Sequence, residues 1–166
     1  EYEWIRTMIQ KENTQAFIVC PLIETSESES LLSVKAAKAE FETLQKDIFP
    51  DLKLGLLHGK MKKDEKDEIM SQFLSNNVHI LVTTPVIEVG IDIPNATVIV
   101  IEAAERFGLA QLHQLRGRVG RSDKQSFCVV FTESKDQYAQ KRLQYFAHTP
   151  DGFKLAEYDL KNRGGG

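Results

Sequence analysis

Apolar runs of strand length alternate along this chain with stretches that repeat at helical spacing, and this alternation restricts the fold more than any other feature. Each run is apolar at nearly every position, which is typical of a strand that is covered on both faces. The runs occupy residues 16–23, 54–58, 80–83, 96–101 and 127–131. Helical patterns occupy residues 4–12, 34–48, 64–74 and 109–115, and two closing helices are expected near 138–146 and 153–160. This order predicts an α/β domain with a mainly parallel sheet flanked by helices.

Composition restricts the class of protein further. The chain has 166 residues, about the length of one domain, and 42% of them are hydrophobic, which is enough for a sizeable core. No apolar run approaches the ~20 residues that a membrane span needs. Cys20 and Cys128 stand in separate runs without CxxC spacing, so we expect neither a disulfide framework nor a zinc cluster. The chain begins at Glu1 with no signal segment, and we expect it to be a piece of a longer cytoplasmic protein.

Basic charge is concentrated in one segment. The net charge of −3 argues on its own against a nucleic-acid-binding protein, yet residues 106–121 hold four arginines and no acid. The end of this segment reads QLRGRVGR and places Arg116, Arg118 and Arg121 among two glycines. Arginine supplies a permanent charge and a planar fork for phosphate oxygens, and glycine lets a ligand approach the backbone closely. The segment therefore predicts a phosphate-binding site.

A second candidate site follows the strand predicted at residues 80–83. Thr83 and Thr84 place two hydroxyl groups at the carboxyl end of that strand, and Gly90 and Asp92 follow in the next loop. Ligands of parallel sheets bind beyond the carboxyl ends of the strands. A hydroxyl group there can hold a phosphate or a water, and an aspartate can accept a hydrogen bond from a sugar hydroxyl.

A third candidate is the dipeptide His58-Gly59, which ends the strand predicted at residues 54–58. Basic residues open the helix that follows it. Helix N-termini and backbone N–H groups bind anions, so a nucleic-acid phosphate is a plausible ligand.

Other chemistries find little support in the sequence. The four histidines lack metal-ligand spacing, and neither a GxSxG motif nor a GxxxxGK[ST] loop is present. The chain thus has phosphate-binding arginines but no phosphate cradle of its own. Two alternatives stay open from the residues alone. One is a nucleic-acid-binding module, α/β or KH-like, because residues 117–120 match GxxG; the other is a stand-alone phosphate-sugar enzyme, for which we find no catalytic base.

The three candidate segments, in this order, resemble the second RecA-like domain of superfamily-two helicases. Residues 79–96 (HILVTTPVIEVGIDIPNA) are similar to motif V, residues 111–122 (QLHQLRGRVGRS) to motif VI, and residues 56–61 (LLHGKM) to motif IVa. The longer form ERFGLAQLHQLRGRVGRS, from residue 105, resembles two families, the RecG branched-DNA helicases and the transcription-repair coupling factor Mfd. Residues 16–24 resemble the RecG form, which favours RecG over Mfd.

The resemblance implies a three-layer RecA-like domain that uses ATP with Mg²⁺, bound mainly by a preceding Walker-motif domain. Arg118 and Arg121 would be arginine fingers that reach the ATP phosphates, and Gln114 would couple that site to the domain interface. Gly90 and Asp92 would lie at the nucleotide edge, with Asp92 facing the ribose. From the spacing of the histidines we expect no metal site within this chain.

On the nucleic-acid side, the resemblance implies that His58, Gly59, Thr83 and Thr84 touch the DNA backbone. Pro85 departs from the family pattern, which has a hydroxyl residue at that position. Thr84 keeps its hydroxyl, so one phosphate contact survives.

The implied organisation is a motor domain over residues 1–134, followed by a helical extension over residues 135–166 that resembles the start of a translocation hairpin. Such a domain would be inactive alone. The whole chain would be a bacterial, cytoplasmic and nucleoid-associated ATP-dependent helicase. It would be monomeric and would act on forks and Holliday junctions in recombination and fork repair. The remaining alternatives are an Mfd-like translocase domain and a nucleic-acid-binding module without enzymatic activity.

Overall fold

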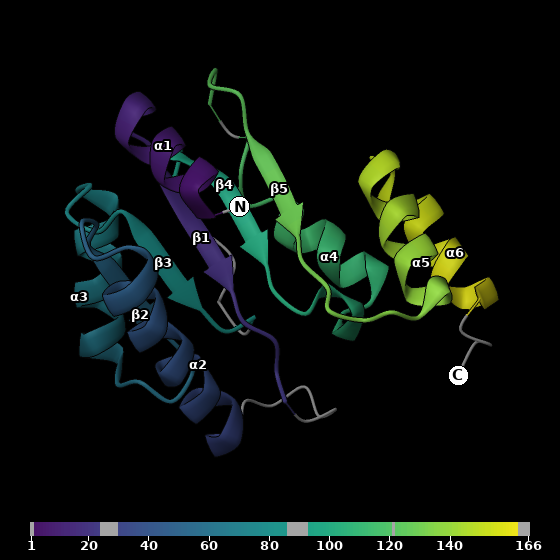
Figure 1. Ribbon diagram of the computed structural model, residues 1–166, viewed down its shortest axis with the longest axis horizontal. Helices are drawn as coiled ribbons and strands as arrows, with labels where there is room; N and C mark the ends of the chain where they lie inside the picture. The colour runs from purple at the N-terminus through teal and green to yellow at the C-terminus, as the bar shows by residue number, and fades with distance from the viewer. Residues whose placement is uncertain (1, 24–29, 86–92, 121, 163–166) are drawn as a thin grey trace.

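A five-stranded sheet runs through the centre of the molecule in the computed structural model, which describes residues 2–23, 30–85, 93–120 and 122–162 (Figure 1). The strand order is β2-β3-β1-β4-β5, and every neighbouring pair is parallel. The strands are β1 (Gln15–Val19), β2 (Leu54–Leu57), β3 (Ile80–Thr83), β4 (Ala96–Ile101) and β5 (Phe127–Val130). The α/β class with a parallel sheet is therefore confirmed, and each of the five strands overlaps a run predicted from the sequence, although β1 begins one residue earlier, at Gln15.

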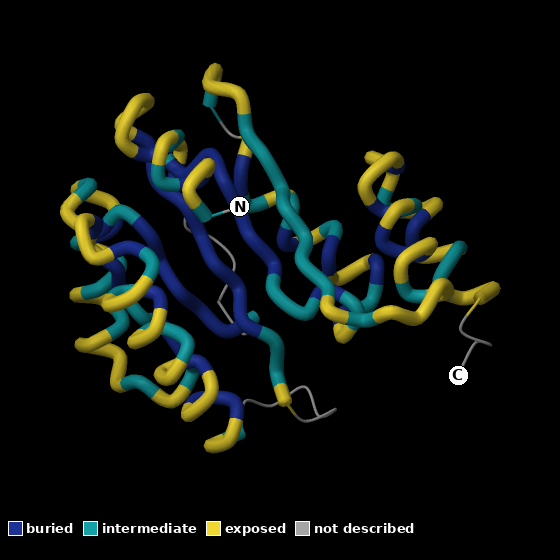
Figure 2. The backbone as a smooth tube through the Cα atoms, viewed as in Figure 1, coloured by how far each residue is buried: buried dark blue, intermediate teal, exposed yellow. Residues whose placement is uncertain are grey.

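Helices cover both faces of the sheet and connect successive strands. They are α1 (Tyr2–Glu12), α2 (Leu31–Thr43), α3 (Lys63–Leu74), α4 (Leu109–Arg116), α5 (Gln137–His148) and α6 (Gly152–Asn162), with a π turn η1 (Leu44–Ile48) and a 3-10 turn η2 (Ala104–Arg106). The central strands are buried along their whole length, whereas β5 at one edge is half-buried (Figure 2). No helix in the described part of the chain is long and apolar enough to cross a membrane.

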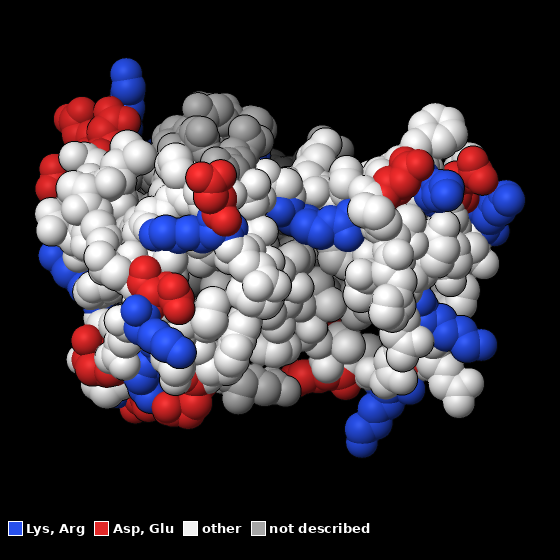
Figure 3. All heavy atoms as spheres, turned by 90° about the horizontal axis from the view of Figure 1, so that it is seen from above, with Lys and Arg blue, Asp and Glu red and all other residues white. Residues whose placement is uncertain are grey.

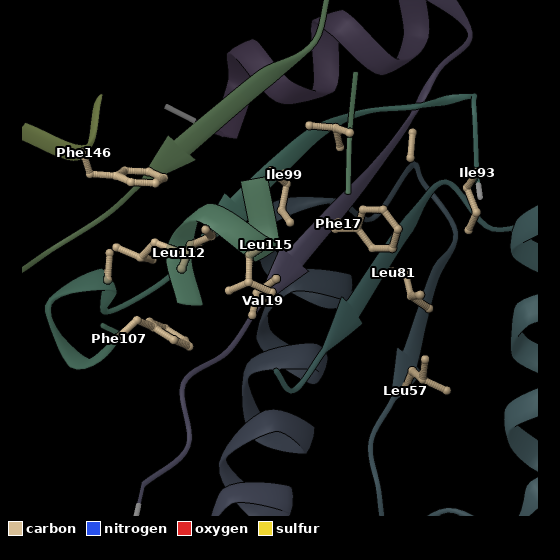
Figure 4. Packing of buried hydrophobic residues seen from close by; sticks show 14 of the residues in the cluster. Phe17, Val19, Leu57, Leu81, Ile93, Ile99, Phe107, Leu112, Leu115 and Phe146 are labelled. Carbon is tan, nitrogen blue, oxygen red and sulfur yellow. The ribbon is translucent and has the colours of Figure 1, made fainter. Parts of the chain in front are cut away.

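Two hydrophobic clusters lie on opposite faces of the sheet, because successive side chains of a strand point to opposite faces. Ile18 points to the face covered by α1 and α2, where it shares a cluster with Ile5 of α1. Phe17 and Ile99 point to the other face, where they meet α3 and α4 (Figure 4). Leu112 of α4 is completely buried in this second cluster. The result is three layers, with the sheet between two layers of helices.

Two predicted boundaries are wrong in detail. The run at residues 16–23 predicts a strand of eight residues, yet β1 ends at Val19. Cys20 still donates its N–H to Thr83 O at 2.8 Å, but Pro21 has no N–H and cannot extend the ladder. The helix predicted at 34–48 begins earlier, at Leu31, because the side chain of Ser30 caps its N-terminus.

The C-terminal helices α5 and α6 pack against α4, as Figure 1 shows at the right of the view. Leu143 and Leu155 join the same buried cluster as Leu112. Asp159 of α6 accepts a hydrogen bond from Leu109 N at 2.6 Å, at the N-terminus of α4. The boundary between a motor domain and an extension at residues 134 and 135 remains a prediction.

Candidate functional site

The four residues assigned to the DNA backbone lie together at the carboxyl ends of β2 and β3. These strands pair with Leu57 opposite Thr83, and Thr84 N donates to Leu57 O at 3.3 Å. His58 is nearly buried, and Thr83 and Thr84 are completely buried. Parallel pairing therefore brings together two segments that are 25 residues apart in the sequence (58 and 83).

The two threonine hydroxyls differ in their bonding. Thr83 Oγ1 donates to Thr84 O at 2.9 Å. Thr84 Oγ1 is buried and has no hydrogen-bond partner among the residues that the structure describes. A buried hydroxyl without a partner costs roughly 1–3 kcal/mol, so such groups in native proteins call for an explanation. Thr84 Oγ1 is therefore a buried hydroxyl at the carboxyl edge whose hydrogen-bond partner the described residues do not supply.

His58 begins a tight turn that leads into α3. Lys60 N donates to His58 Nδ1 at 3.2 Å, and Met61 N donates to His58 O at 3.3 Å. Because Nδ1 accepts this bond, the neutral ring carries its proton on Nε2. Lys60 and Lys62 are exposed directly before α3, although Asp64 of the first helical turn offsets part of their charge. The turn presents basic side chains and a helix N-terminus on one side of the carboxyl edge.

The arginine segment lies elsewhere, on the sheet face covered by α3 and α4. Helix α4 ends at Arg116, and Arg118 follows in a turn whose N–H bonds to Leu115 O at 3.0 Å. Val119 is buried in the cluster of that face, so the turn is anchored. Gly120 has a φ of +88°, and a Cβ atom there would lie 2.9 Å from Ser126 Oγ, so only glycine fits without strain.

Arg118 and Arg116 use their guanidinium groups differently. Arg116 donates to Phe146 O and Thr149 O, each at 3.0 Å, and its guanidinium carbon lies 4.3 Å from the centre of the Phe146 ring. Its contact with His113 Nδ1, at 2.6 Å, makes that nitrogen an acceptor. Arg116 therefore holds α4 to α5. The half-exposed Arg118 makes no side-chain hydrogen bond or ion pair to any described residue, which leaves its guanidinium for another partner.

The structure thus divides the predicted site into two parts. Gln114, exposed on α4, lies one helical turn before Arg118. His58 and Thr84 lie at the carboxyl edge of the sheet. Three predicted site residues, Gly90, Asp92 and Arg121, lie outside the described residues. Their assigned roles, like those of the described ones, stay predictions.

One feature was missed by the sequence analysis, an acidic pocket of about 750 Å³ on the other face of the sheet. It opens beside the ends of β4 and β5 and is lined in part by Tyr2, Glu40, Glu102, Glu105 and Glu133. Tyr2 Oη donates to Glu102 Oε1 at 2.9 Å. Burial, followed by the charge of Glu40, raises the pKa of Glu102 to about 7. No local signal marks this pocket, because its carboxylates come from three separate segments of the chain, around residues 40, 102–105 and 133.

Within the described residues, no group of three or more His, Cys, Asp or Glu side chains could hold a metal ion. Cys20 and Cys128 are free thiols. Burial raises the pKa of the Cys128 thiol to about 11, so this group is protonated at neutral pH.

Comparison with known proteins identifies the family. Residues 1–123 match the model of the helicase conserved C-terminal domain. The chain belongs to this family. The helicase domain is 52% identical over 165 residues to the ATP-dependent DNA helicase RecG of Thermotoga maritima, and 48% identical over 157 residues to RecG of Bacillus subtilis. These matches cover 99% and 94% of the domain, and the resemblance to RecG drawn from the sequence is confirmed.

Solved structures agree with the sequence matches. The helicase domain superposes on the structure of RecG bound to a three-way DNA junction with a TM-score of 0.79, at 48% identity, covering 99% of this chain. Domain 2 of the DEAD-box helicase Mss116p, bound to an RNA duplex, matches with a TM-score of 0.64 at 22% identity, a likeness of fold alone. The RecA-like fold is therefore confirmed. The chain spans about a fifth of the length of the RecG relatives it matches, 21% of the Thermotoga protein.

Proposed function

We propose that this chain is the second motor domain of a RecG-type ATP-dependent helicase that acts on branched DNA in recombination and fork repair. The proposal rests on 52% identity to a RecG protein over 99% of the chain and on the likeness to a RecG structure with a three-way junction. A preceding motor domain of the same polypeptide would bind ATP and Mg²⁺. We further propose that the helicase is monomeric.

The observation that carries the proposal is the contrast between Arg116 and Arg118. Arg116 has a structural role, because its guanidinium group binds two carbonyl groups and lies over an aromatic ring. Folding does not explain Arg118, whose side chain has no polar partner among the described residues although Val119 and Gly120 fix the turn beside it. A fixed turn that presents an unpaired arginine fits the recognition of an anion from outside the domain.

ATP, when bound at the interface with the preceding domain, supplies the phosphoryl group whose hydrolysis drives movement along DNA. Arg118 and Arg121 would bind the phosphate oxygens and stabilise the charge that develops on them, an effect worth ~10³–10⁵ in rate. Gln114, four residues before Arg118, would sense that contact. Gly90 and Asp92 would border the nucleotide.

At the carboxyl edge, Thr84 Oγ1 would donate to a DNA phosphate oxygen, and Thr83, His58 and Gly59 would shape the surface around that contact. Lys60 lies beside them and adds an exposed positive charge. Contacts of this kind position a protein on the DNA backbone without reading its sequence.

The test of the nucleotide role is the steady-state ATPase of the full-length protein with forked DNA. We expect Arg118→Ala and Arg121→Ala each to lower kcat by ~10³-fold or more while ATP and DNA binding persist. Arg118→Lys should recover little, because lysine lacks the planar fork. Arg106→Ala, an exposed arginine of the same basic segment, is the matched control and should keep wild-type turnover. Wild-type turnover in both finger variants would reject the assignment.

The DNA role has its own test. Thr84→Val keeps the shape of the side chain and removes the hydroxyl. Thr97→Val is the control, because it makes the same change in β4, at a second buried hydroxyl without a hydrogen-bond partner among the described residues. We expect Thr84→Val to raise the DNA concentration for half-maximal ATPase stimulation about tenfold, the value of one hydrogen bond to a charged group. Thr97→Val should leave it unchanged. Equal behaviour of the two variants would refute the contact.

A further inference from the structure

The loop between the turn at residues 117–120, which carries Arg118, and β5 is held at the amino edge of the sheet. All five parallel strands begin at this edge, which is the upper one in Figure 1. Lys124 of the loop donates from its Nζ to Asn95 Oδ1 at 3.0 Å, and Asn95 directly precedes β4. The bond therefore joins the loop to a segment 29 positions earlier in the sequence.

The side-chain amide of Asn95 has one orientation that its neighbours allow. Its Nδ2 donates to Asn13 O at 3.2 Å and to Gln15 Oε1 at 3.1 Å, and both of these atoms can only accept. A flipped amide would place its NH₂ group against the ammonium of Lys124 and its oxygen against two acceptors. The oxygen of Asn95 therefore faces Lys124.

Gln15, in turn, is oriented by the core. It is 1% exposed, and its Nε2 donates to Phe73 O at 2.5 Å and to Val78 O at 2.7 Å. These two bonds leave its Oε1 for Asn95. Gln15 N also donates to Asn95 O at 2.9 Å, so the backbone of Asn95 is held as well. Buried groups thus set the position of the acceptor, although Lys124 itself is exposed.

The loop is closely attached to the turn at residues 117–120. A Cβ atom at Gly120 would lie 2.9 Å from Ser126 Oγ, so the two ends of the loop are in contact. Val119, directly before Gly120, is buried in the core. A restraint on Lys124 is therefore also a restraint on the turn that presents Arg118.

Stability accounts poorly for the bond of Lys124, because contacts of exposed charged side chains contribute little to folding. Placement is a stricter requirement, since a group that acts on a reacting phosphate must be held to within about 0.5 Å. We propose that Lys124 is a positioning residue, which through Asn95 holds the turn so that Arg118 meets the phosphates of ATP. This inference rests on the nucleotide role proposed above for Arg118.

The first test is the steady-state ATPase of the full-length protein with forked DNA. Lys124→Met keeps most of the side chain and removes the donor and the charge. We expect it to lower kcat about tenfold and to leave the KM for ATP unchanged, because a misplaced group loses its effect in the transition state. Lys124→Arg keeps a cationic donor and should recover most of the turnover. Urea denaturation should give Lys124→Met the stability of the wild type, which a merely structural role would lower.

Two further variants show whether the bond itself is responsible. Gln125→Ala is the matched control, because Gln125 is exposed in the same loop and its side chain forms no hydrogen bond within the described part of the chain. It should keep wild-type turnover. Asn95→Ala removes the acceptor, so in that background Lys124→Met should cause no further loss. Additive losses in the double variant would overturn the proposal.

Amide hydrogen exchange reports on the turn without relying on catalysis. The N–H of Arg118 bonds to Leu115 O at 3.0 Å and is therefore protected when the turn is held. Mass spectrometry of the peptide that covers residues 117–126 should show faster exchange in Lys124→Met than in the wild type and in Gln125→Ala.

The outcomes separate this inference from the proposed function. Wild-type exchange in Lys124→Met would overturn the positioning role. Wild-type turnover in Lys124→Met, in an assay where Arg118→Ala loses its turnover, would also overturn it and would leave the nucleotide role of Arg118 intact. Wild-type turnover in Arg118→Ala would reject that nucleotide role, and the positioning role with it.

Discussion

Asp159 joins the C-terminal helix α6 to the N-terminus of α4, and its removal is a sharp test of that packing. Helix α4 begins after Gly108, which has no side chain to cap the first N–H groups. Asp159 supplies the cap from α6, with a bond of 2.6 Å from Leu109 N. The same carboxylate pairs at 3.4 Å with Arg142, whose side chain is only 4% exposed. We therefore expect Asp159→Ala to remove a helix cap and to leave a buried cation without its counter-charge.

These two losses set the expected decrease in the free energy of unfolding. A helix cap is worth about 1 kcal/mol, and breaking one partner of a buried ion pair costs about 3–5 kcal/mol. Arg142 keeps its bond to Glu105 O, at 2.8 Å, which places the total toward the lower end. We expect the free energy of unfolding to fall by about 3–4 kcal/mol, which corresponds to a loss of roughly 10 °C in Tm for a chain of this length.

Urea denaturation of the wild type and three variants measures this effect. Asp159→Asn keeps an acceptor for Leu109 N but loses the charge, so it should fall between the wild type and Asp159→Ala. Glu157→Ala is the matched control on the same helix, because its ion pair with Lys161 is long, at 3.9 Å, and exposed. It should change stability by less than about 0.5 kcal/mol. A loss below about 1 kcal/mol for Asp159→Ala would refute the reasoning.

Three further changes test other parts of the structure. Gly152→Ala would bring a methyl group within 2.6 Å of the His113 ring and should cost about 1–3 kcal/mol by overpacking, measured by urea denaturation. Gly120→Ala, at a positive φ and 2.9 Å from Ser126, should cost about 1–2 kcal/mol in the same assay. The raised pKa of Glu102 means that the folded state holds its proton to a higher pH than the unfolded state. Its stabilising contribution should be complete below about pH 4.5 and should be lost as the pH rises through about 7. Thermal unfolding measured across this pH range should show the dependence in the wild type and not in Glu102→Gln.

The sequence predicted the order and kind of the elements well, because the three central strands are buried on both faces and each of the five strands lies in a largely apolar run. The boundaries of the elements were harder to predict. The periodic pattern of residues 34–48 continues smoothly, yet the chain changes there from an α-helix to the π turn Leu44–Ile48. Apolar spacing does not register that change, because Leu44 and Phe49 at the two ends of the π turn are both completely buried, as the helical pattern leads one to expect. The side of the molecule seen in Figure 3 carries acidic and basic side chains interspersed, without a field of one sign, and gives no further indication of a binding surface.

The site shows where such prediction stops. Residue type and local spacing mark the arginine segment as a whole, but Arg116 differs from Arg118 mainly through its bonds to Phe146 O and Thr149 O, 30 and 33 positions further along the chain. That difference depends on how α5 packs, and nothing within the segment encodes it. The acidic pocket is the stronger case, because Tyr2, Glu40 and Glu102 are each unremarkable in their own surroundings. The strand order, which places β4 between β1 and β5, and the packing of α1 and α2 on one face of the sheet bring these side chains into one pocket. Chemistry that arises from topology in this way becomes visible only when the fold is known.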